Sequence, residues 1–295
     1  MMLRSCCRPL ERCFARRGGG GGSDGLLWHS DLKPHASGDY SIAAVQANSN
    51  MEDQSQVYTS PSVTYVGIYD GHGGPEASRF VNKHLFPFMH KFASEQGGLS
   101  VDVIKKAFNA TEEEFWHLVK RSLQVKPQIA SVGSCCLVGA ISNEVLYVAN
   151  LGDSRAVLGR KANQDKRKSV IAERLSTDHN VKVEEVRKEV EALHPDDSQI
   201  VMFARGCWRI KGIIQGIAKR LVRAALNEAA RKKELRYDDI KNVRKGVRRH
   251  IHDDITVIVI YLDRHRRSFP NGRLKKNAIG CTYAPMDIYS LYTAD

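Results

Sequence analysis

Residues 66–74 read VGIYDGHGG, an apolar run that ends in a carboxylate, a glycine and a histidine. The run predicts a strand, and the residues after it predict a helix. Asp70 then lies at a strand end, where a carboxylate can hold a divalent cation. Gly71 lets the backbone approach closely enough to offer its carbonyl, and His72 can donate or accept a proton beside the cation. The stretch therefore predicts a metal site with an acid–base group next to it.

Two acidic pairs elsewhere in the chain suit the same site. Glu52 and Asp53 lie upstream of the strand pattern at 62–69, and Asp253 precedes a long apolar run at 255–262. Each pair alone is a weak signal, since solvated acidic pairs and carboxylates that cap strands are common. Together they supply the oxygen ligands that Mg²⁺ and Mn²⁺ prefer. A divalent cation held there could activate a bound water for hydrolysis.

Strand and helix patterns alternate in clusters from Gly38 onward. Period-two or continuous apolar runs predict strands at 40–45, 62–69, 134–140, 145–150, 200–203 and 255–262, and 155–158 is expected to continue the sheet. Helical spacing predicts helices at 75–94, 101–123, 183–193 and 217–235, with Ser100 as an N-cap. This order predicts an α/β (α+β) fold, a sandwich of two sheets flanked by helices.

Composition describes an ordinary globular chain with a basic balance. The 295 residues are 42% hydrophobic and 26% charged, and the formal net charge is +12. Residues 205–249 hold 15 Lys and Arg against 4 Asp and Glu, a surplus that suits a solvated helix face or an anionic partner. The seven cysteines include no CxxC, which predicts reduced intracellular thiols. No run of eighteen apolar residues occurs, so no membrane-spanning helix is expected.

The first 17 residues form a separate basic segment. Arginine recurs at every fourth position from Arg4 to Arg16, and Cys6 and Cys7 are candidates for acylation. This pattern is compatible with peripheral membrane contact, with an organelle transit peptide, or with a disordered tail; Pro9 argues against a regular helix. The expected location is intracellular: cytoplasm, nucleus or plasma-membrane periphery, with organelle targeting left open.

The motifs together resemble the metal-dependent serine/threonine phosphatases of type 2C (PPM-type), in particular a plant subfamily. The resemblance runs from about residue 36 to 262 and rests on four motifs in the family's order: Glu52-Asp53, the 70–74 stretch, Gly152-Asp153-Ser154-Arg155 and Asp253. The plant character rests on residues 32–35, 52–55 and 186–190. The resemblance implies a phosphatase domain at 36–264 between an N-terminal tail, 1–35, and a C-terminal tail, 265–295.

The resemblance also implies roles for individual residues. Two Mg²⁺ or Mn²⁺ ions would be bridged by Asp70, with the Gly71 carbonyl and Asp253 as further ligands. The residues matching Glu52 and Asp53 bind metal through water, Asp153 matches a third metal position, and His72 matches the acid that protonates the leaving group. The implied substrates are phosphorylated proteins, and the implied state is a monomer with no nucleic-acid partner.

Two departures from the family qualify this prediction. Asn48 stands where many members have a phosphate-binding arginine, which the plant subfamily that this chain resembles also lacks. The second Asp-Gly metal motif is absent, because Gln215 passes directly into Gly216, where the family has an intervening segment. We therefore expect an incomplete fold and impaired phosphoserine and phosphothreonine hydrolysis. The alternative is a catalytically inactive pseudophosphatase that binds phosphoproteins or regulators; a nucleic-acid-binding function has no motif behind it.

Overall fold

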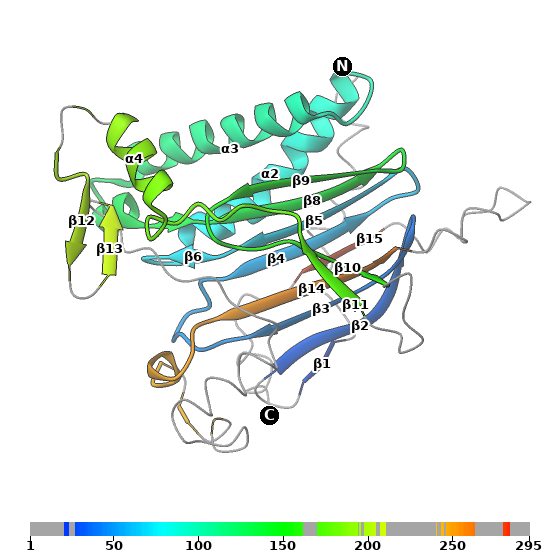
Figure 1. Ribbon diagram of the computed structural model, residues 1–295, viewed down its shortest axis with the longest axis horizontal. Helices are drawn as coiled ribbons and strands as arrows, with labels where there is room; N and C mark the ends of the chain where they lie inside the picture. Colours follow the sequence, from blue (N-terminus) through cyan, green and yellow to red (C-terminus); the bar gives the residue numbers. More distant parts are fainter. Residues whose placement is uncertain are drawn as a thin grey trace, which may run out of the picture.

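The computed structural model describes residues 21–23, 27–161, 170–193, 195, 198–204, 207–210, 240, 243–244, 246–262 and 280–283. They form two stacked antiparallel sheets, with two long helices beside one of them (Figure 1). Hydrogen bonds join the sheets, including Tyr40 Oη to Thr282 Oγ1 at 2.8 Å and Thr256 Oγ1 to Asp53 Oδ2 at 3.1 Å. The predicted α/β (α+β) sandwich with flanking helices is confirmed.

The larger sheet has five strands in the order β15-β4-β5-β8-β9. These are β15 (Gly280–Tyr283), β4 (Gln54–Thr59), β5 (Val63–Tyr69), β8 (Cys136–Ser142) and β9 (Val145–Leu151). Asn143 and Glu144 join β8 to β9 with φ angles of 48° and 68°, as a two-residue hairpin turn requires. The predicted strands at 62–69, 134–140 and 145–150 are thus confirmed within a few residues.

The smaller sheet has four strands in the order β1-β2-β3-β14. They are β1 (Gly21–Ser23), β2 (Leu27–His35), β3 (Gly38–Val45) and β14 (Ile255–Leu262). The pairing of β14 with β3 runs without a break from Ile255 opposite Val45 to Leu262 opposite Gly38. This register places the start of β14 next to the loop that follows β3.

The helix pair covers the larger sheet. Helix α2 (Glu76–Glu95) and helix α3 (Val101–Ser122) pack on each other, and a core including Tyr65, Phe86 and Met89 lies between them and the sheet. Ser100 begins α3 as predicted, since its hydroxyl accepts a hydrogen bond from the Val103 N–H at 3.2 Å. No helix in the described ranges is long and apolar enough to cross a membrane.

Smaller elements lie around the sandwich. They are β6 (Gly71–His72) with β7 (Gly133–Ser134), β10 (Val157–Lys161) with β11 (Val170–Arg174), β12 (Val201–Ala204) with β13 (Cys207–Ile210), helix α4 (Glu184–Leu193), and the 3₁₀ turns η1 (Pro127–Ser131) and η2 (Arg248–His250). The prediction that 155–158 continues the sheet is wrong. The backbone turns at Gly152, whose φ is 113°, and β10 pairs with β11 in a separate ribbon.

Two segments assigned to tails contribute strands to the sheets. β2 lies within the predicted N-terminal tail 1–35, and Trp28 and Ser30 on it are buried. β15 lies within the predicted C-terminal tail 265–295 and pairs with β4, with Thr282 buried. β2 was not predicted because polar residues interrupt its pattern, and β15 was not predicted because it is only four residues long. The predicted helix at 217–235, the 215/216 junction and residues 1–17 lie outside the described residues.

Candidate active site

The predicted acidic residues meet at one end of the sandwich. Gln54 at the start of β4 pairs with Tyr69 at the end of β5, so Glu52, Asp53 and Asp70 leave the larger sheet at the same end. Asp253 arrives there from the smaller sheet, just before β14. The site is therefore built where the two sheets come together.

Asp254 holds this junction in place. Its fully buried carboxylate accepts backbone N–H bonds from Ala47 at 2.7 Å, Asn48 at 3.0 Å and Glu52 at 2.8 Å. These bonds fix the loop between β3 and β4 against the start of β14. Asp254 was not predicted to take part in the site. The adjacent pair Asp253-Asp254 was the available signal, because neighbouring side chains of a strand point in opposite directions and only one of them can face the site.

Two side chains that were not predicted to contact the carboxylates bind them. The Asn48 side-chain amide donates to Glu52 Oε2 at 3.4 Å and to Asp253 Oδ1 at 3.2 Å. Arg249 forms an ion pair with Asp253 Oδ2. Asn48 thus bridges two of the predicted metal-site residues, and Arg249 supplies a positive charge to one of them.

The charges in this group act on Glu52. Burial raises the pKa of Glu52, and the negative charges of Asp254 and Asp70 raise it further, whereas Arg249 lowers it. A carboxylate with a raised pKa binds a proton more readily than an isolated one. Glu52, Asp70, Asp253 and Asp254 therefore form an acidic cluster, and Arg249 lies beside it.

Gly71 fits this place because its backbone is closely packed. A Cβ at position 71 would lie 2.4 Å from the Glu52 carbonyl oxygen and 2.8 Å from Ser78 Oγ. The Ser78 hydroxyl donates to the same Glu52 carbonyl. The glycine thus allows the strand that carries Asp70 to pass directly against the loop that carries Glu52.

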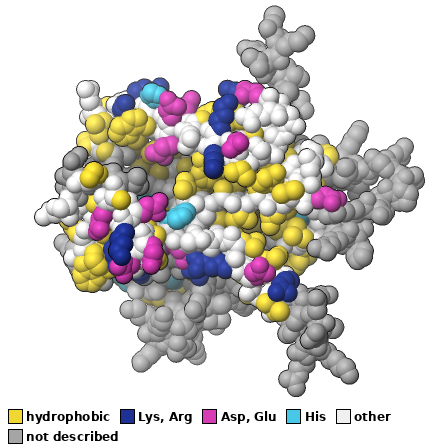
Figure 2. Space-filling model, turned by 45° about the horizontal axis from the view of Figure 1, so that its top comes forward, with side chains coloured by type: hydrophobic (Ala, Val, Ile, Leu, Met, Phe, Trp, Pro, Cys, Tyr) yellow, Lys and Arg dark blue, Asp and Glu magenta, His cyan; other side chains and the backbone are white. Residues whose placement is uncertain are grey.

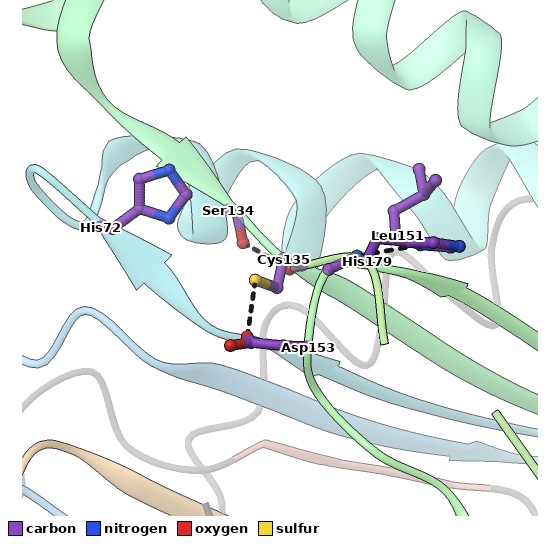
Figure 3. Close-up of a pocket in the computed structure, with 7 residues that line it drawn as sticks. His72, Ser134, Cys135, Leu151, Asp153 and His179 are labelled. Carbon is purple, nitrogen blue, oxygen red and sulfur yellow. Dashed lines mark hydrogen bonds between the residues drawn. The ribbon is translucent and has the colours of Figure 1, made fainter. Parts of the chain in front are cut away.

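His72 lies beside a cavity of about 200 Å³ (Figure 3). The cavity is lined by His72, Ser134, Cys135, Leu151, Gly152, Asp153 and His179. Burial lowers the pKa of His72, and the negative charge of Asp153 opposes that shift. A Cβ at Gly133 would lie 2.4 Å from His72 Nε2, so the imidazole packs directly over that glycine.

Asp153 is buried at the cavity and engaged by two side chains. The Asn180 amide donates to Asp153 Oδ2 at 2.8 Å, and the Cys135 thiol lies 3.6 Å from Asp153 Oδ1. Burial, with the charges of Asp70 and Asp153, raises the pKa of Cys135 to about 12, so the thiol stays protonated. The Cys135 N–H also donates to the Asp70 carbonyl at 2.8 Å, which links the cavity to the acidic cluster.

The predicted metal-site residues are therefore only partly gathered. Glu52, Asp70 and Asp253 belong to the acidic cluster, whereas the Asp53 carboxylate bonds Thr256 and Asp153 lies across the cavity. No three His, Cys, Asp or Glu side chains within the described ranges are arranged to hold a metal ion. Glu52, Asp70 and Asp253 carry the oxygen donors that a hard divalent cation prefers, whereas both oxygens of the buried Asp254 already accept backbone N–H groups.

Carboxylates from both sheets thus meet at one end of the sandwich, and His72 follows Asp70 by two residues in the chain. The sequence model of protein phosphatase 2C matches residues 41–216. Probable protein phosphatase 2C 63 of Arabidopsis thaliana is 56% identical over 372 residues, covering 99% of this chain and 97% of the relative. Probable protein phosphatase 2C 78 of Oryza sativa subsp. japonica is 52% identical, covering 98% of this chain and 94% of the relative. The chain belongs to the protein phosphatase 2C family.

A solved serine-threonine phosphatase 2C from Toxoplasma gondii has a TM-score of 0.49 at 14% identity, covering 79% of this chain and 98% of that chain.

The alignment with the Arabidopsis protein shows a difference in chain length. It spans 372 residues although this chain has 295, so the relative has residues that find no counterpart here. The family match ends at Gly216, the position of the predicted junction. The internal deletion itself stays a prediction.

Proposed function

We propose that this chain hydrolyses phosphoserine and phosphothreonine in proteins with the help of bound Mg²⁺ or Mn²⁺, two ions per chain. Membership of the protein phosphatase 2C family, whose members are metal-dependent serine/threonine phosphatases, supports the reaction. The observation that carries it for this chain is the acidic cluster, whose Asp70 lies two residues before His72 in the chain. The inactive-pseudophosphatase alternative has no specific observation in its favour.

The chain's own groups divide the work. Asp70 and Asp253 would hold the metal, which supplies an activated water and neutralises phosphate charge. Glu52 would orient water through its second oxygen while Asn48 fixes its position. His72 would donate a proton to the leaving oxygen of the substrate side chain; burial lowers its pKa, which makes the protonated form a stronger acid but a smaller fraction at neutral pH, and the charge of Asp153 opposes that shift.

We further propose that the partners are phosphorylated proteins, met by a monomer inside the cell. On the face shown in Figure 2, the described Lys, Arg, Asp and Glu side chains are interspersed and do not form one basic surface. Membrane contact through residues 1–17 stays a prediction from the sequence.

The test is phosphate release from a phosphothreonine peptide by the full chain. We expect release in Mn²⁺ or Mg²⁺, none in excess EDTA, and recovery when the metal is returned. His72→Asn should slow the reaction on the order of 10²-fold, because it removes the proton donor and leaves the metal groups in place. Metal-independent release, or peptide binding without any release, would contradict the proposal.

A further inference from the structure

The end of helix α3 and the turn that follows it expose large apolar side chains. Residues 116–126 make up this segment, which we call the α3 tip. Within it, Trp116 is 54% exposed, Leu123 is 45% exposed and Val125 is 90% exposed. Trp116 and Leu123 are seven positions apart, so they lie on one face of the helix. Single exposed apolar residues are ordinary, but three large ones within ten residues form a local apolar surface.

The α3 tip is held in place from its inner side. Val119 and Ile129 are buried in one apolar cluster, which joins the end of α3 to the 3₁₀ turn η1. The backbone N–H groups of Val125 and Lys126 both donate to the Ser122 carbonyl, at 3.1 Å and 2.8 Å, and so close the turn. The inner residues therefore supply the packing of this segment, and the exposed apolar residues are left over for another contact.

Basic residues accompany the exposed apolar side chains. The α3 tip contains Lys120, Arg121 and Lys126 but no Asp or Glu. The Lys120 ammonium lies 5.1 Å from the centroid of the Trp116 ring. Lys126 forms an ion pair with Glu76 at the start of α2, whereas no ion pair among the described residues involves Lys120 or Arg121. Two positive charges therefore remain beside the apolar surface.

This combination fits the surface of an anionic lipid bilayer. Tryptophan favours the level of the lipid headgroups, and aliphatic side chains favour the acyl boundary below it. Lys and Arg side chains keep their charged ends among anionic headgroups while their stems cover apolar surface. A side chain as exposed as Val125 projects outward from the protein, and a soft bilayer admits it without a preformed pocket.

We propose that the α3 tip docks this chain on anionic lipid bilayers. The turn η1 (Pro127–Ser131) leads from the tip to β7, and β7 pairs with the short strand β6 that carries His72. Docking through the tip would therefore hold the candidate site near the lipid surface. The contact is distinct from the one predicted for residues 1–17, and it does not depend on the proposed phosphatase reaction.

The experiment measures co-sedimentation of the full chain with vesicles of phosphatidylcholine, prepared with and without phosphatidylserine. We expect binding to the vesicles that contain phosphatidylserine and much weaker binding to the others. Trp116→Ala and Val125→Ser should each weaken binding about tenfold, because each removes apolar surface that the bilayer buries. Lys120→Gln should weaken it about fivefold, and only where phosphatidylserine is present.

The matched controls lie at the other end of the same helix. Val101→Ser changes a valine that is 54% exposed, and Lys105→Gln changes an exposed lysine. Neither should alter vesicle binding. Every variant keeps residues 1–17, so a loss of binding that is confined to the tip variants is due to the tip.

Two results would overturn the proposal directly: no binding of the full chain to anionic vesicles, or tip variants that bind as tightly as the unaltered chain. Sedimentation velocity without lipid tests the other occupant. A dimer that Val125→Ser dissociates, with vesicle binding unchanged, would assign the tip to a second copy of the chain and would also overturn the proposal. Urea unfolding curves ensure that folded proteins are compared, and Val125→Ala serves if Val125→Ser does not fold.

Discussion

The two sheets of the sandwich differ in how much of their apolar surface is covered. The five-stranded sheet shares a large core with α2 and α3 that includes Tyr65, Phe86 and Met89. The four-stranded sheet has a small core cluster of Trp28, Ile42, Ala44 and Met51, with Ile258 packed against it. Within the part of the chain that the structure describes, the candidate site therefore joins a sheet with a large core cluster to a sheet with a small one.

The contrast is greatest at β14. It forms the edge of the smaller sheet, and no described strand pairs with its outer side. Tyr261 is 53% exposed and Leu262 50% exposed on this apolar strand, which is a combination that proteins usually cover. Asp253 and Asp254 directly precede this edge strand, whereas Asp70 and His72 directly follow β5 of the larger sheet. We therefore expect a substitution of Asp70 to lower activity and a substitution of Asp254 to lower stability.

Asp70→Asn should have the largest effect, and it should be on activity. The change removes a negative charge from the cluster but keeps the backbone bond from the Cys135 N–H to the Asp70 carbonyl. Loss of a well-placed electrostatic group costs on the order of 10²–10³ in rate. We expect kcat/KM for a phosphothreonine peptide to fall by that factor while the urea midpoint stays nearly unchanged.

The matched control is Glu113→Gln, the same kind of change on the exposed face of α3. It should leave both measurements as they are. A large drop in stability for Asp70→Asn would mean that the covered sheet needs this charge to fold, and the contrast between the two sheets would then be lost.

Asp254→Ala should destabilise the chain by about 3 kcal/mol, because each buried N–H left without an acceptor costs about 1–3 kcal/mol. Three such groups, on Ala47, Asn48 and Glu52, lose their acceptor. Asp254→Asn should cost less, since the amide oxygen can still serve Ala47 and Asn48. Urea unfolding measures both. Equal stability of Asp254→Ala and the unaltered chain would show that this carboxylate does not hold the open sheet to the site.

The sequence predicted the parts of the fold that local patterns determine. The Ser100 cap, the periodicity of α3 and the apolar run of β14 each carry their own signal, and all three are present. β2 was missed because Lys33 and Pro34 interrupt its alternation. β15 was missed because four residues carry little signal, and only pairing with β4, distant in the sequence, makes them a strand.

The residues of the candidate site likewise divide into those that a local motif reveals and those that only the fold brings together. Asp70, Gly71 and His72 follow each other, so one motif revealed them together. The function of Asp254 depends on which way it points after the β3–β14 pairing is set, and that register is a tertiary property. The contacts of Asn48 and Arg249 with Asp253 could not be predicted for the same reason. Asn48 lies about 200 positions from Asp253 in the chain, and Arg249 lies on a turn whose place only the fold determines.

Gly133→Ala tests the covered side of the site with a smaller change. The new Cβ would lie 2.4 Å from His72 Nε2, so the imidazole must move away from its present position. Because a positioned acid contributes about 10²–10⁴ in rate, partial misplacement should lower kcat about tenfold. Steady-state kinetics on the phosphothreonine peptide measures this loss.

Gly98→Ala is the matched control, because a Cβ there meets nothing within 4 Å. It should leave kcat unchanged. If Gly133→Ala kept full activity, either the His72 ring would tolerate the shift or His72 would not act on the leaving group, and the His72→Asn result would tell these apart.

Ser100→Ala should have the smallest effect, and it concerns only the cover of the larger sheet. The serine hydroxyl accepts from the Val103 N–H at 3.2 Å, and its loss leaves one donor at the start of α3 without this partner. Loss of such a cap typically costs about 1 kcal/mol. The urea midpoint should fall accordingly, while kcat stays constant because Ile104 and Val119 still bury the helix against its neighbours. Ser100→Asp, which keeps a capping oxygen, should restore the stability. If Ser100→Ala lowered kcat as strongly as Gly133→Ala, the helices that cover the sheet would be controlling the site, and support and catalysis could not be assigned to separate parts of this sandwich.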